Sequence, residues 1–473
     1  MTAAVPSSWI RPRNRKLVAA VCLAQVLFVV LPFFKGEAAP IIAALVLVST
    51  VALLGSVTLA VLYLCVVAAV VPTKLFDDHL LLPMGFKFYE GLFVVVAGLA
   101  TLNWLGERHL AWRRPTRLDR PLMAFLALLA FSVALGLWYG QPVSQVLRDV
   151  RYPLSYALFF VVTGFFDLKA SRTFLWLLAI SSAVVGVEYL GEFLNVVNLS
   201  ISGSFYRVFR IEGLMLPIGT LGITALLLYD TSLHRRAFAA IGAIPVVLAL
   251  VLTVGRGMWV ALAFGLFLLG VLAFLEYRSG DRSLRQLGAL VMIPVLVVAT
   301  AFVFQRATRT GVGSVALERL ASGINYEEDP SVVGRMGSYK IAVERFLERP
   351  LLGGGHGVTV TYLIPDPVEP FVLTTGQVDN VYLTILMRMG VVGFAVFVWV
   401  FVKGLLIAYR LFRDTSSPQV RQFCATFIAV YGAMLVYGLA DVTMMGNRLI
   451  FWHAAFLGIL ARLDATWREG AQE

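Results

Sequence analysis

The polar residues that could do chemistry lie mainly in one stretch, residues 335–393, between two strongly apolar segments. Asp379 and Asn380 stand where this stretch passes into a long apolar run. As chemistry, a carboxylate at that position can act as a general base for a hydroxyl group. As structure, an aspartate there is a good helix N-cap, worth about 1 kcal/mol. Spacing alone favours the capping interpretation.

The same stretch contains the sequence Gly353-Gly-Gly-His-Gly357. It lacks the Lys-Ser/Thr pair of a nucleotide-binding P-loop and follows no predicted strand, which excludes that kind of site. We interpret the glycines as a sharp turn where an outer loop meets the membrane surface. His356 is either a proton acceptor or simply a polar loop residue, and the second interpretation is the simpler one. Further along, Gly390 and Gly393 allow close helix packing.

Two arginines stand next to apolar segments, where a charge is costly unless it faces a cavity or an anionic partner. Arg256 lies between two such segments, and Arg210 precedes another on the same face. Arg256 can instead cap a tight turn and snorkel, and Arg210 can be a surface residue paired with Glu212. Together they would suit a lipid diphosphate, because guanidinium groups bind phosphate oxygens through two parallel hydrogen bonds. No metal site is expected, since the five histidines are scattered and no acidic cluster has ligand spacing.

The segments that must position these residues are apolar almost from end to end. Hydrophobic residues make up 59% of the chain and charged residues 14%, and the mean hydropathy is +0.83. A membrane span needs about 20 apolar residues, and the chain offers many such runs. A barrel is excluded, because barrel strands alternate apolar and polar residues. The sequence therefore predicts an all-α polytopic membrane protein with about 12–14 transmembrane helices.

The charge distribution predicts the topology. We interpret the net charge of +11 as the excess of Arg and Lys in cytoplasmic loops, not as a surface for nucleic acid. A break at Gly55-Ser56 would divide the long run 40–72 into two helices, which keeps both termini on the cytoplasmic side. The polar stretch then belongs to an outer loop, 306–380, whose helix ends at Arg349-Pro350. The three cysteines lie in apolar runs, so no disulfide framework is expected.

The order of the motifs resembles that of the O-antigen ligase and O-antigen polymerase superfamily, bacterial membrane glycosyltransferases of the GT-C type. The resemblance covers about residues 205–400, which we take as a core between N-terminal helices (1–204) and C-terminal helices with a cytoplasmic tail (401–473). The motifs are Arg210-x-x-Gly213, Gly-Arg256-Gly, Gly-Arg335 followed by Arg349-Pro-Leu-x-Gly353-x-Gly355, and Asn380-x-Tyr382-Leu followed by Gly390-x-x-Gly393.

The resemblance implies a metal-independent, inverting glycosyltransferase without a cofactor. It would lie in the bacterial inner membrane, a multi-pass protein with its active face in the periplasm. Its donor would be an undecaprenyl-diphosphate-linked oligosaccharide. The acceptor would be a hydroxyl of another glycan in a polymerase, or of the lipid A core in a ligase. The product would be O-antigen or exopolysaccharide.

The resemblance also implies roles for individual residues. Arg210 and Arg256 would hold the leaving diphosphate, and Arg335 would orient the loop or touch phosphate. Asp379 stands where ligases usually have a histidine and would be the catalytic base, with His356 as a displaced substitute. The structural part of the motif would be formed by Asn380, Tyr382, Gly353, Gly355, Gly390 and Gly393.

A transporter or flippase of a lipid-linked saccharide is the main alternative, since it would also need outward-facing arginines. Transporters often show inverted repeats with broken helices near the membrane midplane. This sequence shows no matched pair of broken spans, and its polar residues gather at one face. It therefore favours chemistry at a membrane surface.

Overall fold

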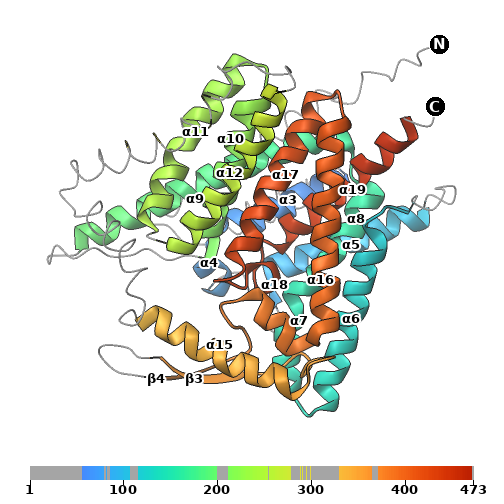
Figure 1. Ribbon diagram of the computed structural model, residues 1–473, viewed down its shortest axis with the longest axis vertical. Helices are drawn as coiled ribbons and strands as arrows, with labels where there is room; N and C mark the ends of the chain where they lie inside the picture. The colour runs from blue at the N-terminus through green and yellow to red at the C-terminus, as the bar shows by residue number, and fades with distance from the viewer. Residues whose placement is uncertain are drawn as a thin grey trace.

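The computed structural model describes residues 56–78, 81–82, 86–106, 115–199, 211–253, 255–278, 330–364 and 371–470, together with residues 288, 290, 295 and 299. Within this part, long helices run side by side. The helix α15 and the hairpin of β3 and β4 lie together at one end of them, and α19 ends at the other (Figure 1).

The described elements, in chain order, are α3 (Val57–Val70), α4 (Thr73–Asp78), β1 (Leu81–Leu82), β2 (Phe86–Lys87), α5 (Phe88–Gly106), α6 (Asp119–Trp138), α7 (Val143–Leu154), η3 (Ser155–Ala157), α8 (Leu158–Phe165), η4 (Leu168–Ala170), α9 (Ser171–Leu199), η5 (Ile211–Leu214), α10 (Met215–Tyr229), α11 (Leu233–Leu252), α12 (Arg256–Arg278), α15 (Pro330–Glu348), β3 (Val360–Ile364), β4 (Phe371–Thr375), α16 (Val381–Asp414), α17 (Pro418–Tyr437), α18 (Thr443–Gly446) and α19 (Ile450–Gly470). The strands form two antiparallel pairs, β1 with β2 and β3 with β4.

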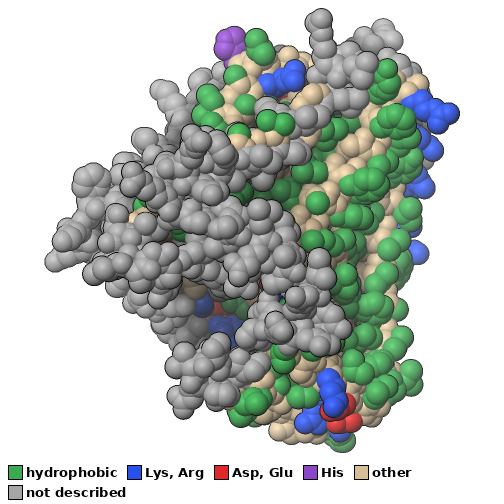
Figure 2. Space-filling model, turned by 60° about the vertical axis from the view of Figure 1, so that its left-hand side comes forward, with side chains coloured by type: hydrophobic (Ala, Val, Ile, Leu, Met, Phe, Trp, Pro, Cys, Tyr) green, Lys and Arg blue, Asp and Glu red, His purple; other side chains and the backbone are tan. Residues whose placement is uncertain are grey.

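The predicted class, an all-α polytopic membrane protein, is confirmed. Among the described residues, seven helical segments are long and apolar enough to cross a bilayer. Figure 2 shows hydrophobic side chains over much of the described surface along the length of the helices. The seven segments are Asp119–Trp138, Leu168–Leu194, Glu212–Tyr229, Leu233–Leu252, Arg256–Arg278, Val381–Asp414 and Pro418–Tyr437.

The break predicted at Gly55-Ser56 coincides with a helix start. α3 begins at Val57, and Ser56 is its N-cap, with the hydroxyl oxygen accepting a hydrogen bond from the Leu59 N–H at 3.1 Å. Residues 1–55, which include the first half of the run 40–72, lie outside the described residues.

The core of the bundle is built around α19, whose residues 450–461 are all buried. Buried polar groups in a membrane bundle need internal hydrogen-bond partners, because lipid offers none. The indole N–H of Trp452 donates to the carbonyl of Cys65 on α3 at 2.7 Å. The hydroxyl of Tyr431 on α17 donates to the carbonyl of His453 at 2.8 Å. These bonds fix α19 against two neighbouring helices.

Candidate functional site

The first part of the site lies at the N-terminal end of α16, around Asp379 and Asn380, which we call the mouth of this helix. Asn380 is the N-cap of this helix, and its side-chain oxygen accepts hydrogen bonds from the N–H groups of Tyr382 and Leu383, both at 3.0 Å. The capping role expected for Asp379 was therefore wrong by one residue. The Asp379 carboxylate is left to face outward, with 55% of the side chain exposed.

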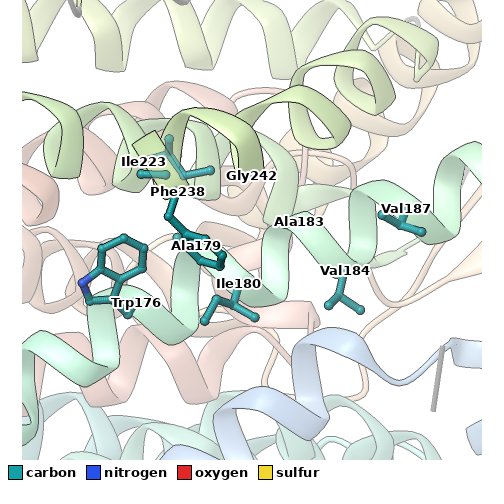
Figure 3. A pocket seen from close by; sticks show the side chains of 10 residues that line it. Trp176, Ala179, Ile180, Ala183, Val184, Val187, Ile223, Phe238 and Gly242 are labelled. Carbon is teal, nitrogen blue, oxygen red and sulfur yellow. The ribbon is translucent and has the colours of Figure 1, made fainter. Parts of the chain in front are cut away.

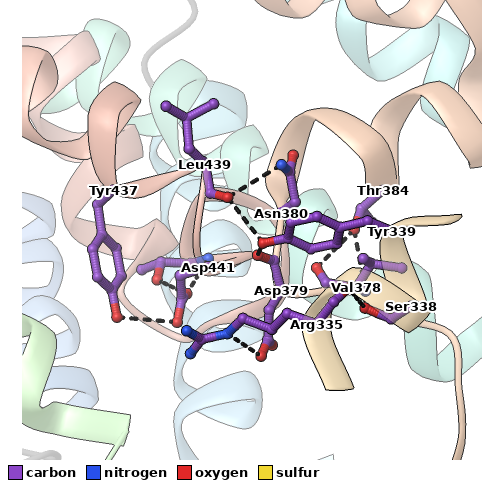
Figure 4. A network of polar contacts seen from close by, with 11 residues as sticks. Arg335, Ser338, Tyr339, Val378, Asp379, Asn380, Thr384, Tyr437, Leu439 and Asp441 are labelled. Carbon is purple, nitrogen blue, oxygen red and sulfur yellow. Dashed lines mark hydrogen bonds and ion pairs between the residues drawn. The ribbon is translucent and has the colours of Figure 1, made fainter. Parts of the chain in front are cut away.

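The helix α15 lies over the start of α16. Nε of Arg335 is 3.3 Å from Oδ2 of Asp379. One turn further along α15, the hydroxyl of Tyr339 lies 2.6 Å from the carbonyl oxygen of Asp379 and 3.0 Å from that of Leu439 (Figure 4). Burial raises the pKa of Tyr339 to about 12, so its hydroxyl keeps its proton and donates. Tyr339 thus ties α15 to α16 and to the end of α17.

A second carboxylate belongs to the same cluster. Asp441 follows α17 and accepts hydrogen bonds from the Thr443 N–H at 2.8 Å and from the Tyr437 hydroxyl at 3.2 Å. In Figure 4 the guanidinium of Arg335 points toward Asp441 and Tyr437. Burial, together with the negative charge of Asp379, raises the pKa of Asp441. Asp441 was not among the residues predicted from the sequence, although an acidic side chain at the end of an apolar run is a signal.

Arg256 reaches the same end of the bundle. It is the first residue of α12 and is half-buried. Its neighbour Gly257 packs against α17, since a Cβ there would lie 3.1 Å from the ring of Tyr437. Arg256 therefore begins its helix beside the turn that carries Asp441. Arg210, the other arginine expected to hold phosphate, lies outside the described residues.

The comparison with protein families singles out this region. Residues 241–398 match the family model described as O-antigen ligase. These residues, a third of the chain, resemble that family. The match contains Arg256, Arg335 and Asp379, whereas Arg210 and Asp441 lie outside it, and it confirms the resemblance to the ligase and polymerase superfamily. The comparison with curated proteins gives no match.

The matched region, residues 241–398, contains a broken helix. Within α16, Gly390 has φ 64° and ψ −167°, a conformation that is essentially restricted to glycine. The backbone groups at this break bond to the glycine-rich loop. The N–H groups of Gly354 and Gly355 donate to the carbonyls of Met387 and Arg388 at 2.8 and 3.0 Å, and the Val391 N–H donates to the Pro350 carbonyl at 2.9 Å.

The contact between the loop 349–357 and the break in α16, which we call the joint, requires glycine because the two backbones approach closely. A Cβ on Gly353 would lie 2.4 Å from the carbonyl carbon of Arg388, and one on Gly390 would lie 2.3 Å from the Leu351 carbonyl oxygen. Gly355 touches Gly136 of α6, where a Cβ would come within 2.3 Å of the Gly136 nitrogen. Gly390 thus receives the loop, rather than serving the packing between helices that the sequence suggested.

The other two residues of the structural motif also stabilise the start of α16. The hydroxyl of Tyr382 donates to the carbonyl of Leu435 on α17. A Cβ on Gly393 would lie 2.2 Å from the Cβ of Met389, one turn back across the break.

His356 is part of this joint and is completely buried. Its Nδ1 lies 2.8 Å from Oγ of Ser132 on α6. Because the Ser132 hydroxyl donates to the carbonyl of Arg388 at 3.0 Å, its oxygen accepts from Nδ1–H, which leaves Nε2 unprotonated. Burial and the charge of Arg388 hold the pKa of His356 well below its ordinary value of 6.5. His356 is a neutral side chain inside the joint, while Asp379 has the exposed position.

A buried ion pair between Arg388 and Asp149 stabilises the joint. Nη2 of Arg388 lies 2.8 Å from Oδ2 of Asp149 on α7, and the two side chains are only 1% and 3% exposed. Arg388 also donates to the carbonyl of Gly376, and Asp149 accepts from the Gly357 N–H at 3.2 Å. This pair was not predicted from the sequence, although Arg388 interrupts an apolar run.

A cavity of about 230 Å³ between α9, α10 and α11 has a different character. It is lined by apolar side chains, among them Trp176, Ile180 and Phe238 (Figure 3). Such a lining suits hydrocarbon and offers no group for proton transfer. Among the described residues, no group of three or more His, Cys, Asp or Glu side chains could hold a metal ion.

Proposed function

We propose that this protein is a glycosyltransferase of the bacterial inner membrane that moves a glycan from undecaprenyl diphosphate to an acceptor hydroxyl at the periplasmic face. It would act in the ligation or polymerisation of a cell-surface polysaccharide. The observation that carries the proposal is the pair of Arg335 and Asp379 at the mouth of α16, inside the region that matches the O-antigen ligase family. This pair puts a phosphate-binding cation beside a carboxylate that can accept a proton.

The donor would lie with its diphosphate between α12 and α15. Arg256 and Arg335 come to the same end of the bundle from these two helices, and Arg210 would be the third phosphate ligand. Guanidinium groups bind phosphate through two parallel hydrogen bonds and keep their charge, so they stabilise the leaving diphosphate. The polyprenyl tail would lie along the apolar helices.

The reaction would be a single displacement without a metal ion. The acceptor oxygen attacks the anomeric carbon, and the bond from that carbon to the diphosphate oxygen breaks with inversion. Asp379 takes the proton of the acceptor hydroxyl, and the negative charge of the diphosphate is neutralised by the arginines.

The resting pair of Arg335 and Asp379 suggests how binding prepares the base. With no donor bound, the guanidinium neutralises the carboxylate. When a diphosphate arrives, Arg335 turns toward the phosphate oxygens, and Asp379 loses its nearest positive charge. The carboxylate of Asp379 is then released from its ion pair and can accept a hydrogen bond from the acceptor hydroxyl.

The test is complementation of a deletion strain with wild type, Asp379→Asn, Arg335→Ala and Arg256→Ala, followed by gel analysis of the surface glycan. Arg345→Ala is the matched control, because Arg345 is an exposed arginine on the same helix, paired only with Glu348 among the described residues. All variants must be present in the membrane at wild-type levels. We expect the three site variants to lose transfer and the control to keep it.

The gel also separates the candidate activities. Single repeat units on the acceptor would identify a polymerase, and full-length chains on undecaprenyl diphosphate with a bare acceptor would identify a ligase. An unchanged glycan in all site variants would overturn the proposal. Lipid-linked units retained on the cytoplasmic side would instead identify a flippase.

A further inference from the structure

We infer that the end of the bundle remote from Asp379 holds a second binding site, which takes a phosphate-bearing anion between Arg172, Arg235 and the start of α17. This inference does not depend on the proposed transfer reaction.

The site is a polar cavity of about 370 Å³. Its walls are the beginning of α9, the turn between α10 and α11, and the first residues of α17. α17 has 20 residues and ends at Tyr437, which bonds to Asp441 in the candidate active site. A helix of that length measures about 30 Å. The cavity and the active site therefore lie at opposite ends of one helix.

The charged groups of the cavity are already arranged around one carboxylate. Oδ1 of Asp230 accepts from the Ser232 N–H at 2.9 Å and from Nε of Arg235 at 3.0 Å. Oδ2 accepts from Nη2 of Arg172 at 2.8 Å and again from Nε of Arg235 at 2.9 Å. Both carboxylate oxygens are occupied, and two arginines against one aspartate leave one net positive charge.

Most N–H groups of the Arg172 and Arg235 guanidinium groups have no hydrogen-bond acceptor in the described chain. Within the described chain, the terminal nitrogens of Arg235 make no hydrogen bond, and only Nη2 of Arg172 makes one. Asp230 holds both guanidinium groups in place, so a ligand would meet donors that are already oriented. Such pre-organised forks favour phosphate oxygens.

The start of α17 adds further donors. Its N-cap Ser417 makes no side-chain capping bond, and Pro418 occupies the first turn. The N–H groups that follow have no partner inside the helix, and the helix dipole favours an anion there.

A buried amide supplies independent evidence for a ligand. Gln422, one turn into α17, lines the cavity and is 3% exposed. Its side-chain nitrogen is buried and has no hydrogen-bond partner in the described part of the chain. An amide nitrogen can only donate, and leaving a buried donor unpaired is costly. The cavity thus gathers donors from three sources, and the missing component is an acceptor with several oxygens.

The experiment uses the purified full-length protein in detergent and two probes, phosphatidylglycerol and inorganic phosphate, with diacylglycerol as a neutral lipid control. Bound lipid is measured by native mass spectrometry, and phosphate binding by the rise in the unfolding temperature. The variants are Arg235→Gln and Gln422→Leu. Arg410→Gln is the matched control, because Arg410 is exposed near the same end and does not line the cavity.

We expect wild type to retain phosphatidylglycerol over diacylglycerol and both site variants to lose about tenfold in affinity, with the control unchanged. If inorganic phosphate is bound and the lipid is not, the ligand is a free phosphate compound. If Arg235→Gln fails to fold, Gln422→Leu still decides, because it leaves the ion pairs intact. Wild-type binding of both probes by the site variants, an equal loss in the control, or no binding by wild type would overturn the inference.

Discussion

Arg335 and Asp379 lie 3.3 Å apart although 44 residues separate them in the sequence. Arg335 belongs to α15, and Asp379 directly precedes the N-cap of α16. Tyr339 joins α15 to the start of α16 by bonding to the Asp379 carbonyl, and to the end of α17 by bonding to the Leu439 carbonyl. The fold thus brings a cation and a carboxylate together at the end of the membrane helices.

Substitutions of Arg335 and of Asp379 should affect different kinetic parameters. Under the proposed mechanism Arg335 contacts phosphate, so Arg335→Ala should raise the KM for the lipid-linked donor about tenfold. The same mechanism makes Asp379 the general base, so Asp379→Asn should lower kcat by about 10²- to 10⁴-fold. Steady-state kinetics of the purified protein with varied donor concentration measures both. Equal effects of the two variants on KM alone would contradict the role of Asp379 as base.

Gly390 should not tolerate a side chain. Gly390→Ala puts a Cβ 2.3 Å from the Leu351 carbonyl oxygen at a backbone conformation that costs a non-glycine residue about 1–3 kcal/mol. We expect a clear drop in the unfolding temperature measured in detergent. Gly337→Ala is the control, since Gly337 lies in α15 with nothing within 4 Å of its Cβ position, and alanine there should stabilise the helix by up to about 1 kcal/mol. Similar unfolding temperatures for Gly390→Ala and Gly337→Ala would contradict the requirement for glycine at position 390.

The Arg388–Asp149 pair should be needed for the segment 349–357 to dock against α16. Asp149→Asn leaves a buried, uncompensated guanidinium, a change that typically costs about 3–5 kcal/mol. We expect the 349–357 segment to become sensitive to limited proteolysis and the unfolding temperature to fall. Glu348→Gln removes an exposed pair on α15 and should cost at most about 1 kcal/mol. Protease resistance equal to wild type in Asp149→Asn would show that the ion pair does not hold the loop.

His356 should make the protein less stable in acid. Its pKa in the folded state lies well below 6.5, so below about pH 6.5 the unfolded chain binds a proton that the folded protein does not. Stability is therefore lost as the pH falls below about 6.5. Unfolding temperatures of wild type and His356→Gln at pH 7.5 and 5 measure the difference. The variant should lose less on acidification, and His234→Gln, at an exposed position, should behave as wild type.

The class of the protein could be predicted because long apolar runs have one physical solution in a bilayer. The helix start at Ser56 and the end of α15 before Arg349-Pro350 also follow from local chemistry. The cap of α16 could not be predicted, since Asp379 and Asn380 are equally good caps and the backbone conformation decides between them.

The buried partners could not be predicted for a different reason. Asp149 and Arg388 belong to different helices and are 239 residues apart in the sequence. A single sequence does not say which helices pack together. The same holds for Asp441, which joins Arg335 and Asp379 only because α17 ends beside α16. Periodicity identifies the helices, but their order in space comes from packing.

The joint at Gly390 has a consequence for how the protein is made. The loop that closes the break, 349–357, leaves the ribosome before α16 does, yet its partners lie within that later helix. Until the loop has docked, Val391 and its neighbours lack these partners, and unpaired backbone groups in lipid cost several kcal/mol each. A newly inserted α16 should therefore begin as a continuous helix and acquire its bend only when the loop docks against it. Bending of α16 would then be a late step of folding that follows the insertion of the helices.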